Sequence, residues 1–379
     1  MSLNFDLDEE HQLLRDTVRQ FALEKVAPVA EELDREKRFP YELVQEMAEL
    51  GLMGMTIPEE YEGGGSDTLA YAIAIEELTR IDSSVAITVA AHHSLGTLPI
   101  WYFGSDEQKR EWIPDLASGR KLAAFGLTEP GAGSDAGATR TTAKLDGGEW
   151  AIDGAKMFIT NAGTDITACV TITALTGDGE VSNIVVPNGT PGYTISPPMQ
   201  KLGWRASDTR ELSFQGARVP EGNLLGPRGE GFRQFLKILD GGRISVAAMG
   251  VGLAQGAYDL ALAYAKEREQ FGKPIAKFAA VQDKLVDMAT EIEAARHLVW
   301  KAAWEKDLGR DFARTAAMAK LYSGELSHRA ANWSLQIHGG YGFMDEYAIS
   351  RLYRDQKILE IGEGTNEVQR MVIARHLGL

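Results

Sequence analysis

Apolar residues recur at helical spacing in the first third of the chain. Between residues 8 and 26, Leu14 and Val18 fall on one face of a predicted helix, because positions three and four apart share a side. Asp6 is the expected N-cap, with Glu9 three residues later. Further helices are expected at 41–50 and 68–79, with a loop at 57–65 and a buried apolar run at 85–91.

The pattern changes near Gly119. From Lys121 to Leu225 the chain is dense in Gly, Thr, Val and Ile, with turn signals at short intervals. The sequence Asp146-Gly147-Gly148 separates two strand-like runs and predicts a β-hairpin. Further strands are expected at 156–160, 168–174, 183–187 and 211–214. This part of the chain therefore predicts a small β domain with a closed or sandwich-like sheet.

A second change comes at residues 226–231. Beyond it, long segments rich in Ala, Leu, Lys and Glu are typical of bundle helices. These segments are 232–268, 281–306, 312–334 and 363–377. The pattern as a whole predicts an α+β multidomain chain, with an N-terminal helical domain at 1–118, a middle β domain at 119–226 and a C-terminal four-helix bundle at 227–379.

Composition narrows the classes of partner. The 379 residues carry a formal net charge of −15, which argues against nucleic acid, since phosphate neutralisation needs a basic surface. No apolar run of membrane-spanning length interrupts the sequence, so no membrane insertion is expected. Residues 1–10 have neither the secretory nor the transit pattern, and Cys169 is the only cysteine. We therefore expect a cytoplasmic protein without disulfides, and the histidines show no metal-binding spacing.

The segment 125–135 is polar and rich in glycine, which lets backbone N–H groups approach a ligand closely. From composition alone an ordinary surface loop would be the better interpretation. The segment has neither the Gly-Lys-Ser/Thr of a Walker loop nor a Gly-x-Gly-x-x-Gly fingerprint. Its interpretation depends on three other segments, 268–274, 336–343 and 354–370.

Together these four segments resemble the signatures of acyl-CoA dehydrogenases, in that family's order and over the whole chain. Residues 239–244 are most similar to the short-chain and bacterial butyryl-type enzymes. The resemblance implies the acyl-CoA dehydrogenase fold and FAD as cofactor. It also implies α,β-dehydrogenation of a fatty acyl-CoA to a trans-2-enoyl-CoA, with hydride transfer to flavin N5, as in fatty acid β-oxidation.

In this resemblance Glu363 matches the catalytic base that removes the α-proton, and its backbone N–H is expected to polarise the thioester oxygen. Outside the motif, Glu363 would be interpreted as a carboxylate at a helix start. Some relatives place the base at the position of Gly242, which has no side chain to act as one.

The resemblance also implies contacts with FAD and with the substrate. The cofactor-binding residues expected along the flavin and its phosphates are Phe125, Leu127, Thr128, Gly133, Ser134, Phe158, Ile159, Thr160, Thr365, Asn366 and Glu367. Those expected to reach the FAD of a neighbouring subunit, or its adenosine end, are Arg268, Phe271, Gln336, Gly339 and Gly340. Those expected to bind the acyl-CoA are Ser134, Asp240, Arg243 and Gly364. By default Arg243 would be a solvated helix charge, and Phe158 a strand core residue.

Two departures from the family pattern affect this interpretation. Ala279 stands where many relatives have a Gln that contacts the adenosine, and Gly362 stands where many have Tyr. The missing ring predicts a wider pocket that admits longer or branched acyl chains. The expected partners are electron-transferring flavoprotein as acceptor and further copies of the chain in a homotetramer. Two alternatives remain: a flavin oxidase on the same fold, and a scaffold without turnover.

Overall fold

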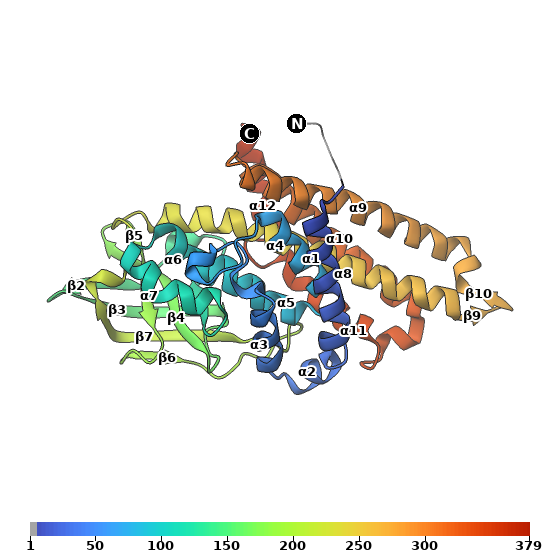
Figure 1. Ribbon diagram of the computed structural model, residues 1–379, viewed down its shortest axis with the longest axis horizontal. Helices are drawn as coiled ribbons and strands as arrows, with labels where there is room; N and C mark the ends of the chain where they lie inside the picture. Colours follow the sequence, from blue (N-terminus) through green and yellow to red (C-terminus); the bar gives the residue numbers. More distant parts are fainter. Residues whose placement is uncertain (1–5) are drawn as a thin grey trace.

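The computed structural model describes residues 6–379 and is elongated, with its strands at one end and a small hairpin at the other (Figure 1). Helices lie between these ends. The chain order is helical, then β, then helical, which confirms the fold class expected from the sequence.

The first group of elements is helical, and side-chain caps set where two of its helices begin. Asp8 accepts a hydrogen bond from the N–H of His11 at 2.9 Å and is the N-cap of α1 (Glu9–Phe21), so the expected cap at Asp6 is wrong by two residues. Asp67 caps α4 (Thr68–Thr79) through the N–H of Ala70 at 2.7 Å, and the bounds of α4 match the prediction. The other helices of this group are α2 (Ala30–Glu36), α3 (Tyr41–Glu49), α5 (Ser83–Ala90), a π-helical turn (Ala91–Thr97), α6 (Leu98–Phe103) and α7 (Asp106–Ala117).

The second group forms one mixed eight-stranded sheet. Its order is β6-β7-β3-β2-β4-β5-β8, and β1 pairs in parallel with β4. Within residues 6–379 the order has two ends, so hydrogen bonding does not close the sheet. The predicted hairpin joins β2 to β3, with Asp146 opposite Glu149. The strands are β1 (Leu122–Gly126), β2 (Thr142–Asp146), β3 (Glu149–Thr160), β4 (Thr167–Gly177), β5 (Glu180–Pro187), β6 (Tyr193–Ile195), β7 (Thr209–Pro220) and β8 (Leu224–Leu225).

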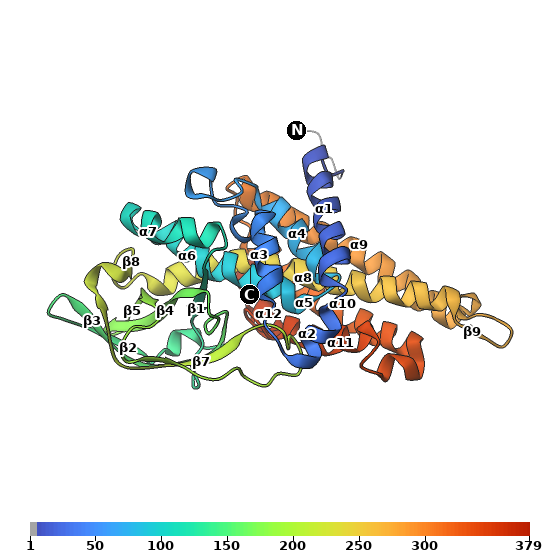
Figure 2. The same cartoon turned by 60° about the horizontal axis from the view of Figure 1, so that its bottom comes forward.

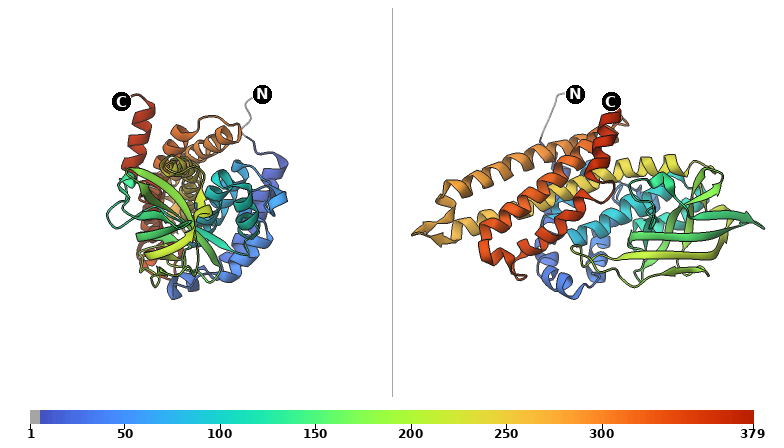
Figure 3. Two further views of the ribbon diagram at one scale, coloured as in Figure 1. Left: turned by 90° about the vertical axis from the view of Figure 1, so that its left-hand side faces the viewer. Right: turned by 180° about the vertical axis from the view of Figure 1, so that it is seen from behind.

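The third group contains the longest helices. Helix α8 (Gly231–Glu267) has 37 residues and runs along most of the long axis, from the sheet toward the hairpin (Figures 1 and 3). The remaining elements are the hairpin strands β9 (Glu269–Gln270) and β10 (Lys273–Pro274), and helices α9 (Ala279–Asp307), α10 (Ala313–His338), α11 (Ala348–Asp355) and α12 (Asn366–His376). Helix α12 begins three residues after the predicted start at Glu363, which instead lies in the preceding turn.

The largest hydrophobic core joins the first and third groups. Ile75 and Leu78 of α4 are fully buried in the same cluster as Val251 of α8 and Met288 of α9. Figure 2 shows α4 and α5 enclosed between the first helices and the long helices of the third group. At the contact of α4 with α8 a Cβ added to Gly252 would lie 2.3 Å from a backbone carbonyl oxygen, so only glycine fits there.

Helix α8 is the one helix, among the residues that the structure describes, with the length and composition to cross a membrane. Most of its apolar window, 67%, is buried inside the protein. Its apolar character is thus accounted for by packing in the core.

Candidate active site

Glu363 lies in a tight left-handed turn immediately before α12. Its φ is 52° and that of Gly364 is 93°, a conformation that is unfavourable for a residue with a side chain. Three side-chain hydrogen bonds to the carbonyl oxygens of Glu363 and Gly364 hold this turn. The Lys320 Nζ donates to the Gly364 carbonyl at 2.8 Å, and the Gln369 Nε2 donates to the same oxygen at 2.9 Å and to the Glu363 carbonyl at 3.3 Å.

The Glu363 carboxylate packs directly against α8 at Gly242. A Cβ added at Gly242 would lie 2.1 Å from Glu363 Oε2, well inside contact distance. The hydrogen atom of glycine is therefore what makes room for the carboxylate. Positions 242 and 363, the two at which the sequence resemblance places a base, meet at the same point in this structure.

The carboxylate oxygen Oε2 is withdrawn from water although Glu363 as a whole is partly exposed. Oε2 is buried and has no hydrogen-bond partner within residues 6–379. Burial raises the pKa of Glu363 to about 7, and the nearby cations of Lys320 and Arg243 oppose that rise without cancelling it. Desolvation thus dominates, and the side chain exchanges a proton near neutral pH.

The backbone N–H of Glu363 donates to no acceptor among the residues that the structure describes. The carbonyls of Glu363 and Gly364 are engaged by Lys320 and Gln369, which leaves the Glu363 N–H available to a ligand. An unpaired N–H beside a buried carboxylate matches the needs of enolate-forming chemistry, in which a base and an oxygen-stabilising donor act on adjacent atoms.

Asp240 and Arg243, on the same helix as Gly242, form a salt bridge of 2.5 Å. Arg243 is only 3% exposed, so the default interpretation as a solvated charge is wrong. Burial lowers the pKa of Arg243 and raises that of Asp240, and in each case the partner's charge opposes the shift. Both residues lie within two positions of Gly242 on α8, and the charge of Arg243 acts on the Glu363 carboxylate.

The glycine-rich segment after β1 is anchored by a buried ion pair that sequence reasoning missed. Lys156 Nζ lies 2.8 Å from Glu129 Oε1, with 0% and 6% of the two residues exposed. Glu129 also accepts from the backbone N–H groups of Arg140 and Thr141. The signal in the sequence was Lys156, a charged residue within a predicted strand, which could have indicated a buried ion pair. Around this anchor Phe125 is buried, Leu127 and Thr128 are half-buried, and Gly133 and Ser134 are exposed.

The end of β3 presents one of its three predicted residues to the surface. Phe158 has a φ of 63° and is 60% exposed, so it is no strand core residue. Ile159 is 3% exposed, and its side chain lies in the core of the sheet rather than beside a cofactor surface. Thr160 is half-buried.

The predicted residues at the start of α12 lie at a helix N-terminus, where the helix dipole favours anions. Thr365 is the N-cap and accepts from the N–H of Val368 at 3.3 Å. Asn366 is buried, and its Oδ1 has no hydrogen-bond partner within residues 6–379. Glu367 is exposed.

The remaining predicted residues gather at the far end of the molecule. Arg268, Gly339 and Gly340 line one surface pocket of about 520 Å³, with the Arg268 guanidinium 5.5 Å from the Tyr341 ring centre. Phe271 stands at the hairpin tip, 94% exposed and with a φ of 54°. Gln336 is exposed beside this pocket without lining it.

The buried histidine, the cysteine and Trp204 lie outside the candidate active site. His92 accepts from the N–H of Ala123 through Nδ1 and contacts the Leu116 carbonyl through Nε2, and burial lowers its pKa to about 4. No cluster of potential metal ligands occurs in the described part of the chain. Cys169 is buried, and Trp204 packs against the large core.

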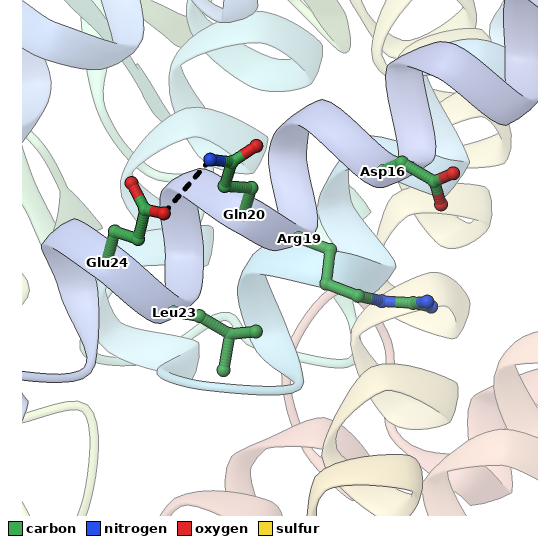
Figure 4. Close-up of a pocket in the computed structure, with 5 residues that line it drawn as sticks. All are labelled: Asp16, Arg19, Gln20, Leu23 and Glu24. Atoms are coloured by element: carbon green, nitrogen blue, oxygen red, sulfur yellow. Dashed lines mark hydrogen bonds between the residues drawn. The ribbon is translucent and has the colours of Figure 1, made fainter.

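A pocket of about 220 Å³ lies on the outer face of α1 and the turn that follows it (Figure 4). Its lining includes Gln20 and Glu24, which are hydrogen-bonded at 2.9 Å. None of the predicted site residues lies on these elements, so this pocket has no link to the arrangement around Glu363.

Comparisons with known proteins agree along the whole chain. Profiles described as the N-terminal, middle and C-terminal domains of acyl-CoA dehydrogenase match residues 8–120, 124–217 and 229–378. The probable acyl-CoA dehydrogenase YngJ of Bacillus subtilis (strain 168) is 52% identical over 99% of this chain and 100% of its own length.

Two solved structures extend this similarity to three dimensions. Butyryl-CoA dehydrogenase from Megasphaera elsdenii matches with a TM-score of 0.96 and 41% identity over 100% of both chains. An acyl-CoA dehydrogenase from Bacillus anthracis in complex with FAD matches with a TM-score of 0.92 and 36% identity, over 98% of this chain and 67% of the other.

Proposed function

Because the chain belongs to the acyl-CoA dehydrogenase family, whose members are FAD-dependent oxidoreductases, we propose that it oxidises a fatty acyl-CoA to a trans-2-enoyl-CoA with Glu363 as the base. The observation that carries this proposal is the buried carboxylate over Gly242, whose pKa is raised to about 7. A solvated carboxylate is too weak a base for an α-proton, and burial strengthens it.

The backbone of the same residue supports the other half of the reaction. As the Cα–H bond breaks, its proton passes to the Glu363 carboxylate and negative charge builds on the thioester oxygen. The unpaired N–H of Glu363 is a donor for that oxygen, in a position fixed by Lys320 and Gln369. The hydrogen on Cβ leaves with its electron pair as the C=C bond forms.

The residues that the resemblance assigns to FAD carry groups suited to that cofactor. The exposed Phe158 ring offers an apolar face, the N-terminus of α12 offers backbone donors to a pyrophosphate, and the buried Oδ1 of Asn366 lacks a partner in the described residues. When bound, FAD supplies the two-electron acceptor for the β-hydrogen. Leu127, Thr128 and the loop anchored by Glu129 would hold it from the sheet side.

The distal residues support an assembly of several chains. With a rise of about 1.5 Å per residue, Gly242 and Arg268 lie roughly 39 Å apart on α8. That separation exceeds the length of an extended flavin dinucleotide. We therefore propose that Arg268 and Phe271 serve the FAD of another subunit, in a homotetramer of this chain.

The proposed electron acceptor is electron-transferring flavoprotein, and the proposed pathway is fatty acid β-oxidation. For the acyl group we propose that straight and branched chains are both admitted. Gly362 places no aromatic ring beside the base, and a Cβ there would already lie 3.3 Å from the Ile358 carbonyl oxygen.

The decisive experiment replaces the base with its neutral isostere. In Glu363→Gln the backbone N–H remains but the carboxylate is lost, so anaerobic addition of butyryl-CoA should reduce the flavin at least about 100-fold more slowly. Glu325→Gln, which removes a partly exposed carboxylate paired with Arg370, serves as the control and should behave like the wild type. Full reduction of the flavin in the Glu363→Gln enzyme at the wild-type rate contradicts the proposal. Oxygen consumption during turnover would identify an oxidase.

A further inference from the structure

Lys320 of α10 is a buried cation without a strong partner of its own. It is 0% exposed and among the largest fully buried side chains of the described residues. The one hydrogen bond of its ammonium group within residues 6–379 runs to a neutral acceptor, the Gly364 carbonyl, at 2.8 Å. A single neutral acceptor does not offset the cost of burying an ammonium group, so the charge requires a nearby anion.

The charged groups that face Lys320 come from every side of the turn. They are Glu363 in the turn, Arg243 on α8, Glu360 in the 3-10 segment Gln356–Glu360 and Glu367 on α12. Among the anions, Glu360 is paired with Lys357 at 2.5 Å and Glu367 is exposed at the protein surface. Glu363 is buried, and its Oε2 has no hydrogen-bond partner in the described residues.

The cations near the Glu363 carboxylate also differ in whether they already have an anionic partner. Arg243 is the second cation near its carboxylate, but Arg243 is engaged by Asp240 at 2.5 Å. Tyr71 of α4 also faces Glu363 and is neutral, because burial raises its pKa. Lys320 is therefore the cation left to balance an ionised Glu363.

From this arrangement, and on the basis of the function proposed above, we propose that Lys320 is a positioning residue for proton abstraction. It holds the Gly364 carbonyl, and with it the left-handed turn that aims the Glu363 carboxylate at Gly242, and its ammonium stabilises the ionised carboxylate.

The direction of the electrostatic effect follows from the structure. Burial lowers the pKa of Lys320 to about 8, so the ammonium is still protonated where Glu363 titrates. Loss of the cation removes an influence that lowers the pKa of Glu363, so the base should ionise only at higher pH. The rate should then fall most on the acid side and recover at alkaline pH.

Three substitutions separate the roles. Lys320→Met removes both the donor and the charge, Lys320→Gln keeps an N–H donor without charge, and Lys320→Arg keeps the charge. The measurement is the pH dependence of kcat/KM for butyryl-CoA with an artificial electron acceptor. The flavin spectrum and Tm of each holoenzyme are recorded alongside. Lys25→Met removes an exposed cation from a surface ion pair with Glu46, outside the groups that face Lys320, and is the control.

We expect the acid limb to move up by about one pH unit in the Met and Gln variants, an approximately 10-fold loss at acid pH that falls on kcat rather than KM. The Arg variant and the Lys25→Met control should keep the wild-type midpoint. An unchanged midpoint in Lys320→Gln, or an equal shift in the control, overturns the proposal. If Lys320→Met does not fold, the Gln and Arg variants decide. Failure here, with Glu363→Gln still inactive, would leave the proposed function standing.

Discussion

The contact between Gly242 and Glu363 allows the smallest possible test of the site, the addition of one methyl group. In Gly242→Ala the new Cβ would lie 2.1 Å from Glu363 Oε2, whereas ordinary van der Waals contact begins near 3.4 Å. The carboxylate must then move by about 1.3 Å, because the helix backbone on the other side is fixed by core packing.

A displacement of this size is large for catalysis. Misplacing a reacting group by about 1 Å costs on the order of 100-fold in rate, which corresponds to about 2.7 kcal/mol in the activation free energy. The assay is kcat/KM for butyryl-CoA with an artificial electron acceptor. Flavin content and Tm show whether the protein is intact.

Gly241→Ala is the matched control, one residue away on the same helix. Its Cβ would meet only Lys306 Nζ, at 3.7 Å, which is ordinary contact. Both substitutions raise helix propensity by about 1 kcal/mol, so that effect cancels between them. Wild-type kcat/KM in Gly242→Ala, or equal losses in the two variants, would refute the inference that Gly242 makes room for the base.

Two further outcomes follow from the charges of the site. Glu363 acts as a base only when it is ionised, and its pKa is raised to about 7. The wild-type kcat/KM should therefore rise with pH through a midpoint near 7. A flat profile between about pH 6 and 8 contradicts the assignment of Glu363 as the base. Glu129→Gln should lower the free energy of unfolding by about 3–5 kcal/mol, measured by urea denaturation, because it leaves the Lys156 ammonium buried without its partner. A loss below about 1 kcal/mol would show that Lys156 finds another way to be solvated.

Much of the helix and strand pattern could be predicted, because local signals and tertiary packing agree there. Helix α4 starts at the N-cap Asp67, and its bounds match the apolar pattern. The β2–β3 hairpin follows from Asp146-Gly147-Gly148. The start of α12 was wrong because Glu363 resembles a helix-start acid, whereas its positive φ depends on contacts with Lys320 and Gln369 from other elements.

The sequence motifs predicted which residues form the candidate site, but they did not predict how deeply each of those side chains is buried. The burial of Arg243, Lys156 and Lys320 depends on which helices and strands cover them, and no local pattern encodes that. Ile159 is a similar case. It shares a motif with Phe158, but a register shift of β3 between Lys156 and Ile159, where Phe158 has a positive φ, turns the Ile159 side chain into the sheet core.

The core that joins α4 to α8 has a consequence for folding of the chain during its synthesis on the ribosome. Apolar residues such as Ile75 and Leu78 share this core with Val251 and Met288, partners that lie more than 150 positions downstream. At about 5–20 residues per second, their side chains wait roughly 10–40 s for those partners to be synthesised. During that interval the nascent helices expose an apolar surface, so chaperone capture of ribosome-bound chains should peak before Val251 emerges from the exit tunnel and decline after it.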